Sequence, residues 1–276
     1  MLPAETVTWL DGRTSVTGDH PGDFPSSLDP APAMPPPNAY LFVDLDDSLL
    51  QTREKCPTGP LTLAAHDRDG QPLSFHTPAQ ATLLGLLEGV PLIPVTGRNL
   101  TALRRVVSPR FASYRITSHG ALVLGPDERP LPSWETQIDA QAAVWGPRLS
   151  AVAAVAEDAI REAGVAVRAR VIEDLGFPVY LSLKGPEADL LALAERLAPH
   201  WPDGRLHHNH HNLALLPPYA DKAAAVRHLI DAITSISPVP PLFIGLGDSL
   251  TDLPFLRLCN FALVPRDSQI QRHTWR

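Results

Sequence analysis

The sequence predicts an α/β fold built on a parallel sheet, because three apolar runs have the character of fully buried strands. These runs are Tyr40–Val43, Pro91–Val95 and Leu242–Leu246. Strands that read as continuous apolar runs are typical of parallel sheets covered on both faces. Polar residues follow each run directly, and ligands bind in the crevice at the carboxyl ends of such strands. The ends of the three runs are therefore the places to search for a functional site.

The first run stops at two carboxylates, Asp44 and Asp46, which are one residue apart. Two neighbouring acids repel each other and need a partner, and a divalent cation is the simplest one. The segment is therefore a candidate site for phosphate chemistry. On this segment alone, a strand followed by an acidic turn explains the residues equally well.

The second run ends in Thr96, Gly97 and Arg98. A threonine at a strand end beside glycine offers a hydroxyl and backbone N–H groups to a phosphoryl oxygen. The alternative for Thr96 is a helix cap or turn residue, which is common.

Lys222 opens the periodic stretch 221–233, which has the pattern of an amphipathic helix. A cation at the amino end of a helix opposes the helix dipole, so a nearby anion is a reason for its presence. A solvated surface lysine is the usual alternative. The third run ends in Gly247 and Asp248, and Asp252 follows four residues later.

In this order the motifs resemble the haloacid dehalogenase-like (HAD) superfamily of phosphohydrolases. The residues that carry the resemblance are Asp44–Leu49, Thr96, Lys222 and Gly247–Asp252. Thr96-Gly97-Arg98, together with Ile116–Ala121, is similar to the branch with a large cap inserted after the third core strand, which includes many sugar-phosphate phosphatases. The resemblance covers roughly residues 39–265 and implies a doubly wound, Rossmann-like core with an inserted α+β cap.

The motifs depart from the superfamily pattern at four positions. Asp47 replaces the commoner glycine and Ser48 the commoner threonine, and both remain compatible with the pattern. Thr251 and His119 stand where asparagine is usual. These last two can change neighbouring hydrogen bonds or substrate choice without removing a group that contacts the phosphate.

The resemblance implies catalytic roles for the two first-strand acids. Asp44 would be the nucleophile that forms an aspartyl-phosphate, and Asp46 the general acid and then the base. Mg²⁺ would be bound by the Asp44 carboxylate, the Asp46 backbone carbonyl and the Asp248 carboxylate.

The remaining motif residues would bind phosphate or support the site. Thr96, Gly97, Arg98 and Lys222 are the candidates for holding phosphoryl oxygens. Asp252, with Ser249, would support a metal-bound water or orient Lys222.

The function expected from the resemblance is Mg-dependent release of phosphate from a small organophosphate. A sugar phosphate or a phosphorylated glycosyl acid is the expected substrate. One alternative is a phosphomutase, which uses the same four motifs on a sugar phosphate. Another is a non-catalytic regulatory protein that binds a phosphorylated metabolite.

The composition of this 276-residue chain argues against two classes of partner, nucleic acids and membranes. A small phosphorylated metabolite is the expected partner. The net charge of −7 and the lack of a basic stripe argue against nucleic acid. No apolar stretch reaches the ~20 residues of a membrane span, and we expect no signal peptide and no membrane partner. Cys56 and Cys259 are far apart in sequence, which fits a reducing cytoplasm. The oligomeric state is left open.

The chain divides into three predicted parts. Residues 1–38 form a proline-rich arm that is extended or disordered. Residues 39–120 and 213–276 form the core domain. Residues 121–212 form the α+β cap, because about 100 residues between Gly120 and Asp221 are too many for a loop.

Within the first core half we expect a hairpin, two helices and a strand. The hairpin pairs Leu61–Ala65 with Pro72–Phe75. One helix begins at Thr77-Pro78, the other spans Leu100–Val107, and the strand spans Tyr114–Thr117. In the expected cap, turn signals and periodicity alternate. Its elements are a hairpin of Ala121–Leu124 and Pro130–Trp134, a helix that ends at Gly164, strands Val165–Val171 and Pro178–Leu183, a helix over Pro186–Leu197 and a strand over Leu206–Leu216.

Several cap residues are weaker candidates for function. His207, His208, His210 and His211 could bind a metal, with His208 and His210 on one strand face, but a solvated or rim-lining strand is the favoured interpretation. Some of these histidines, Lys184 or Arg170 could face substrate. Trp134, Trp145 and Trp201 are expected in the cap core rather than as platforms for sugar stacking.

Overall fold

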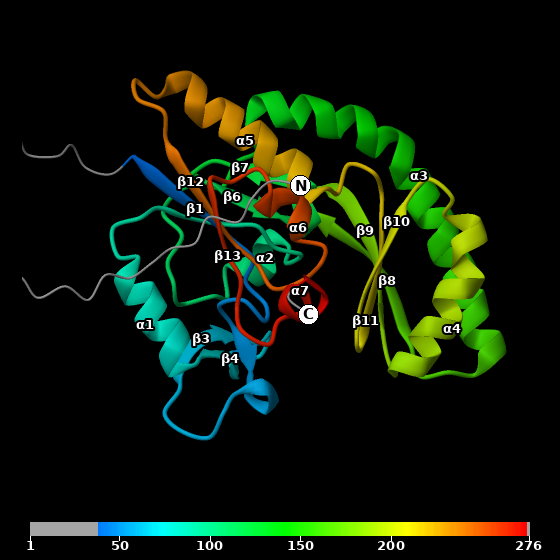
Figure 1. Ribbon diagram of the computed structural model, residues 1–276. Helices are drawn as coiled ribbons and strands as arrows, with labels where there is room; N and C mark the ends of the chain where they lie inside the picture. Colours follow the sequence, from blue (N-terminus) through cyan, green and yellow to red (C-terminus); the bar gives the residue numbers. More distant parts are fainter. Residues whose placement is uncertain (1–37, 275–276) are drawn as a thin grey trace, which may run out of the picture. The chain divides into compact units, whose positions relative to one another are not determined.

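The computed structural model describes residues 38–274, and their central feature is a parallel sheet. Its strands, in spatial order, are β13 (Phe261–Leu263), β12 (Leu242–Leu246), β1 (Ala39–Val43) and β5 (Leu92–Pro94). The first three are labelled in Figure 1. All three pairings are parallel. A parallel bridge from Val95 to Ile116 brings β6 (Arg115–Thr117) next to β5. The predicted α/β fold class with a parallel sheet is therefore confirmed.

Helices cover both faces of this sheet, as the apolar strand sequences require. Leu41 and Val43 of β1 pack in a cluster with leucines of α1 (Pro78–Leu86). Phe42, which points the other way, belongs to a second cluster with residues of α5 (Lys222–Ile236) and α6 (Leu253–Leu256). Both sides of the same strand are thus fully buried, the arrangement expected for a doubly wound sheet.

A small antiparallel sheet follows β1 along the chain. It is formed by β2 (Gln51–Thr52), β4 (Pro72–His76) and β3 (Thr62–His66), with a 3-10 turn, Arg53–Lys55, after β2. The predicted hairpin is present, and Asp67 closes its turn by accepting N–H groups of Asp69 and Gln71. Thr77 and Gln80 then form a capping box at the start of α1, as expected from the Thr-Pro pair.

A second sheet lies within the long segment between the core halves. Its antiparallel strands, in spatial order, are β10 (Arg205–Asn209), β11 (Asn212–Leu216), β9 (Phe177–Lys184) and β8 (Arg168–Asp174). Two helices, α3 (Pro132–Ala163) and α4 (Glu187–Leu197), cover one face of it (Figure 1). A 3-10 turn, Ala198–His200, extends α4, and α7 (Gln269–Thr274) ends the described chain.

Three predicted elements were wrong, and in each case a tertiary contact or turn decided the outcome. Pro130–Trp134 is not a strand, because α3 begins at Pro132 and the buried Trp134 indole donates to the Ala121 carbonyl. The predicted helix after Asn99 is shorter: α2 spans only Leu100–Leu103, and the chain then hydrogen-bonds to β3 through Val107 and Ala64.

The third error is the single strand predicted over Leu206–Leu216. The structure has a hairpin of β10 and β11, because His210 takes a positive φ of 47° and reverses the chain. Pairing of β11 with β9 and β10 places residues 213–216 in the second sheet. At the other end, β7 (Leu122–Leu124) pairs with β6. Residues 37–276 form one compact unit, so the division into core and cap stays a prediction.

Two further expectations concern the proline-rich arm and membrane spans. The predicted proline-rich arm, 1–38, lies outside the described residues except for Asn38. In the part of the chain that the structure describes, no helix combines the length and apolar character that a membrane crossing requires.

Gly120 is fixed by both its backbone angle and its surroundings, which gives a test of the packing beneath α5. Its φ is +95°, and a Cβ there would lie 2.3 Å from the backbone carbonyl of Asp221. Gly164 also has a positive φ, +64°, but a Cβ there would meet nothing within 4 Å.

We expect Gly120→Ala to lower the free energy of unfolding by more than about 3 kcal/mol, because backbone strain and a steric clash add. Gly164→Ala carries strain alone and should cost about 1 kcal/mol. Urea unfolding of both variants measures the difference, and equal losses would show that the clash at Gly120 relaxes freely.

Candidate active site

The carboxyl ends of three neighbouring strands bring the predicted site residues together. Val43 of β1 is in register with Leu246 of β12 and Pro94 of β5. The Asp44 N–H continues this pattern by donating to the Leu246 carbonyl at 2.8 Å. Asp44, Thr96 and Asp248 therefore follow their strands at one edge of the sheet, as predicted.

Three carboxylates form the centre of this edge. One oxygen from each of Asp44, Asp248 and Asp252 lies within 4.8 Å of the others. The Ser48 hydroxyl links two of them, at 3.2 Å from Asp248 Oδ1 and 3.4 Å from Asp44 Oδ2. Asp252 has no exposed surface and Asp44 only 7%. Carboxylates this close and this buried require a cation.

Lys222 supplies one positive charge to this cluster. Its Nζ lies 2.7 Å from Asp44 Oδ1 and 2.7 Å from Asp252 Oδ1. Lys222 is the first residue of α5, and Asp221 caps that helix by accepting the N–H groups of Ala223 and Ala224. The anion expected beside Lys222 is thus the carboxylate pair. One ammonium against three carboxylates leaves an excess of negative charge.

Burial and crowding shift the pKa values of these groups. Burial, reinforced by Asp252 and Asp248, raises the pKa of Asp44 well above its usual range even though Lys222 opposes the shift. Burial and Asp252 also raise the pKa of Asp248 to about 6. For Lys222, burial disfavours the ammonium, but Asp252 and Asp44 outweigh it and raise the pKa. The cluster therefore favours binding of a further cation.

The loop after β5 holds the other predicted phosphate ligands. Thr96 is 1% exposed, and its hydroxyl accepts the Arg98 N–H at 3.1 Å. At Gly97 a Cβ would lie 2.5 Å from the His119 imidazole, so no larger residue fits. Arg98 Nε donates to the Asp46 carboxylate at 2.9 Å. Arg98 thus holds the predicted general acid, a contact that the sequence did not reveal.

The predicted supporting residues lie around Asp252. One of its oxygens binds Lys222, and the other accepts the Ser249 hydroxyl at 2.7 Å and the Ser249 N–H at 3.1 Å. The Thr251 hydroxyl is 2.7 Å from that of Ser249. Of the two roles predicted for Asp252, this geometry favours the orientation of Lys222.

Sequence reasoning missed Asp174, a buried acid at the end of β8. Its carboxylate accepts the Leu100 N–H and the hydroxyls of Thr117 and Ser118, the last at 2.7 Å. It therefore ties the second sheet to the loop that leads from β5 and to the end of β6. The chain gave no signal for this role, because none of its three partners lies near position 174 in sequence.

Two further side chains of the second sheet reach the site. The Tyr180 hydroxyl donates to the Gly97 carbonyl at 3.3 Å, and its ring meets that of His119 edge-on at 5.1 Å. The His207 ring lies 5.2 Å from His119 on another side. Burial first, and then His207 and Lys222, lower the pKa of His119 well below its usual value. A hollow of about 240 Å³ beside Lys222 is lined by His119, Arg205 and His207.

The idea that His208 and His210 share a strand face was wrong. β10 ends at Asn209 and His210 lies in the turn, where its carbonyl oxygen is 3.0 Å from His208 Nε2. Among the described residues, the only metal-suited group of three or more side chains is the aspartate cluster. His207 alone of the four histidines lines the hollow, in agreement with the rim-lining interpretation.

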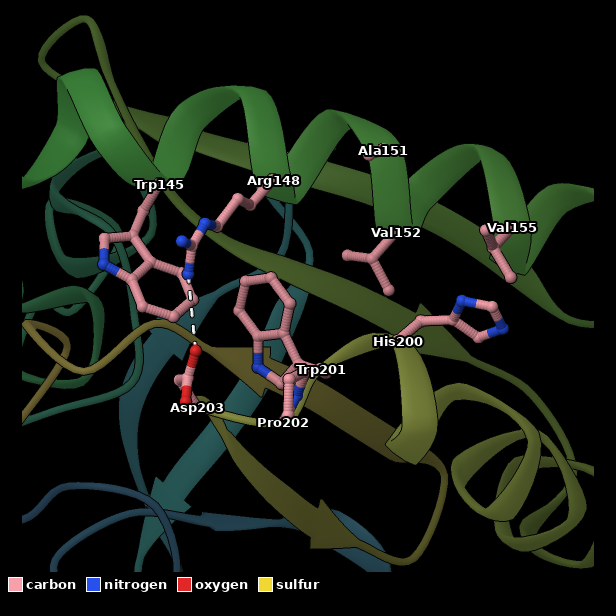
Figure 2. Close-up of a pocket in the computed structure, with 9 residues that line it drawn as sticks. All are labelled: Trp145, Arg148, Ala151, Val152, Val155, His200, Trp201, Pro202 and Asp203. Atoms are coloured by element: carbon pink, nitrogen blue, oxygen red, sulfur yellow. Dashed lines mark hydrogen bonds and ion pairs between the residues drawn. The ribbon is translucent and has the colours of Figure 1, made fainter.

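The three tryptophans pack in the interior, as expected. Trp134, Trp145 and Trp201 are 6%, 7% and 4% exposed. A second hollow of about 370 Å³ opens beside two of them, where the Arg148 guanidinium lies 4.7 Å from the Trp145 ring (Figure 2). Its lining comes from α3 and the segment after α4 and includes none of the predicted site residues.

The chain matches no known family profile and no curated protein sequence. Its fold is similar to the C-terminal domain of trehalose-6-phosphate phosphatase from C. albicans, with a TM-score of 0.52 and 15% identity over 80% of this chain and 73% of that one. The chain therefore has the same fold as this phosphatase domain.

Two other solved structures are similar to this chain. Sucrose-phosphatase from Synechocystis, in complex with sucrose and phosphate, has a TM-score of 0.49 and 17% identity over 87% of each chain. A haloacid dehalogenase-like hydrolase from Bacteroides thetaiotaomicron has a TM-score of 0.47 and 12% identity over 82% of this chain and 94% of that one.

The contacts of Asp174 predict a large stability effect. Asp174→Ala leaves two buried hydroxyls and an N–H without their acceptor, so we expect a loss of about 2–4 kcal/mol in the free energy of unfolding. Asp203→Ala is the control, because its exposed pair with Arg148, at 3.5 Å, should contribute less than about 0.5 kcal/mol. Urea unfolding compares the two, and similar small losses would show that Asp174 does not anchor the second sheet.

Proposed function

We propose that this chain is a phosphohydrolase that releases inorganic phosphate from a small phosphate monoester, either a sugar phosphate or a phosphorylated glycosyl acid. The observation that carries the proposal is the buried Lys222, held by Asp44 and Asp252 beside Asp248 at the carboxyl edge of the parallel sheet. The fold supports it, since the C. albicans protein of the same fold is a trehalose-6-phosphate phosphatase.

The donor groups fit Mg²⁺, which prefers oxygen ligands and is bound through a few carboxylates. Three carboxylates lie within reach of one another, and a single ammonium offsets only part of their charge. The Asp44 and Asp248 carboxylates and the Asp46 backbone carbonyl would hold the ion. When bound, it neutralises phosphoryl oxygens and keeps the crowded acids ionised.

Asp44 is suited to attack phosphorus because one of its oxygens is fixed by Lys222. In the proposed reaction an Asp44 oxygen bonds to phosphorus while the bond from phosphorus to the leaving oxygen breaks. Asp46 gives its proton to that leaving oxygen. Water then attacks the aspartyl-phosphate, Asp46 takes a proton from the water, and phosphate leaves with the carboxylate of Asp44 restored.

Lys222, Arg98 and Thr96 would assist Asp44, the proposed nucleophile, and Asp46, the proposed general acid and base. Lys222 balances the negative charge that gathers around phosphorus. Arg98 donates to the Asp46 carboxylate and so orients the group that transfers the proton. Thr96 lies beside Asp44 on the next strand and offers its hydroxyl and neighbouring N–H groups to a phosphoryl oxygen.

We expect Asp44→Asn to lower kcat for p-nitrophenyl phosphate by at least about 10³-fold, since the amide cannot form the covalent intermediate. Asp231→Asn, at an exposed position of α5, is the matched control and should keep full activity. Circular dichroism checks that both variants are folded. If Asp44→Asn still hydrolyses the ester in the presence of Mg²⁺, Asp44 is not the nucleophile. If the unmodified protein converts a sugar phosphate into its isomer and releases no free phosphate, it is a mutase.

Metal binding has a readout that does not depend on activity. We expect Mg²⁺ at about 100 times its Kd to add about 2.7 kcal/mol to the free energy of unfolding, since it binds only the folded cluster. Asp248→Asn should abolish this gain, whereas Asp231→Asn should retain it. Thermal unfolding with EDTA and with Mg²⁺ measures the effect, and an equal gain in Asp248→Asn would place the ion elsewhere.

A further inference from the structure

The second sheet has one covered face and one open face. Val179, Leu181 and Leu183 of β9 have no exposed surface and pack beneath α3 and α4. Because side chains alternate along a strand, Tyr180 and Lys184 point from the opposite face. This side, opposite to the one that α3 and α4 cover, is called the open face below.

Strand register collects cations on the open face. Lys184 is directly opposite Arg168 of β8, and Ser182 is directly opposite Arg170. On β10, His207 is opposite Ala214, which in turn is opposite Ser182 of β9, so Arg205, two residues before His207, lies on the same face. The acidic residues of these strands, Glu173 and Asp174, pair with Pro178 and Phe177 at the end of β8 opposite to Arg168. The paired stretches 168–172, 180–184, 212–216 and 205–207 contain none.

Most of these cations have no carboxylate partner. Arg205 pairs with Asp221 at 2.7 Å. In contrast, Arg168, Arg170 and Lys184 make no ion pair with any residue that the structure describes. Like charges directly opposite each other on neighbouring strands are destabilising, so the pair of Lys184 and Arg168 costs stability unless an anion joins it.

The open face is turned toward the leaving-group side of the proposed active site. Tyr180, two residues before Ser182, donates to the Gly97 carbonyl, and His207 lies against His119. Burial and the charges of Arg168 and Arg68 lower the pKa of Lys184, while Asp46 opposes that shift.

We propose that the leaving group of the substrate carries a second anionic group, a carboxylate or a phosphate, which Lys184 and Arg168 bind on the open face. This inference rests on the proposed phosphohydrolase function. Lys222 and Thr96 would bind the reacting phosphoryl group, so Lys184 and Arg168 are not needed to bind it. A neutral sugar would leave two directly opposed cations uncompensated, whereas an anion forms charge-assisted hydrogen bonds with both.

The test compares substrates that differ by a single anionic group. Glucose 6-phosphate and 6-phosphogluconate differ by a carboxylate, and fructose 6-phosphate and fructose 1,6-bisphosphate differ by a phosphate. We expect kcat/KM to be at least about 10-fold higher for one of the two anion-bearing members than for its partner. The pair that shows the preference identifies the second group as carboxylate or phosphate.

Substitutions then assign the preference to Lys184. Lys184→Met should reduce kcat/KM for the preferred substrate at least about 10-fold more than for p-nitrophenyl phosphate, and Lys184→Arg should retain most of the preference. The control is Arg196→Met on α4, an exposed arginine paired with Glu162, which should leave both values unchanged.

Two results would overturn the inference while the proposed function stands. One is hydrolysis of p-nitrophenyl phosphate without preference in either substrate pair. The other is an equal loss on all substrates in Lys184→Met, which indicates a structural role. If the wild-type protein with Mg²⁺ releases no phosphate from any of these compounds, the proposed function fails, and the inference falls with it.

Discussion

The shared ammonium of Lys222 is the contact on which the arrangement of the site depends. It joins Asp44, which follows β1, to Asp252, which immediately precedes α6, and it belongs to the first turn of α5. A buried charge of this kind is tolerated only when it is paired, so the three elements must keep their positions. The pairing is incomplete, since Asp248 lies beside it and makes no ion pair with any residue that the structure describes. The remaining negative charge suits this edge of the sheet to binding a further cation.

Much of this arrangement could be predicted because it follows from local pattern and one rule of topology. Fully apolar strands imply a parallel sheet, and parallel strands present their carboxyl ends at one edge, so Asp44, Thr96 and Asp248 had to meet. Contacts between residues distant in sequence could not be predicted in this way. The pair of Arg98 and Asp46 and the three hydrogen bonds of Asp174 carry no periodic signal. Two of the wrong predictions have a similar cause. The strand predicted over Leu206–Leu216 is interrupted by a turn with a positive φ at His210, and the helix predicted over Leu100–Val107 ends early where the chain hydrogen-bonds to β3.

Asp174 and Tyr180 explain how the second sheet can take part in the chemistry. Both contact the stretch around Thr96–Ser118, the first through a buried carboxylate and the second through its hydroxyl. Burial raises the pKa of Asp174, and hydrogen bonds from Ser118, Leu100 and Thr117 oppose that shift, so the carboxylate depends on these donors. A carboxylate that has lost water needs all of its partners, and this requirement fixes the hairpin of β8 and β9 over the loop after β5.

Charge is divided between the two halves of the proposed site. The chain as a whole carries −7, and its central cluster is acidic, which by itself repels a phosphate ester. Lys222 and a bound cation would make the charge positive only at the place where the phosphoryl group reacts. The open face supplies positive charge at the other end of the substrate, where Arg168 and Lys184 face each other without an acid between them. A substrate with anions at both ends gains from each set of charges, whereas one with a neutral leaving group gains only from the first.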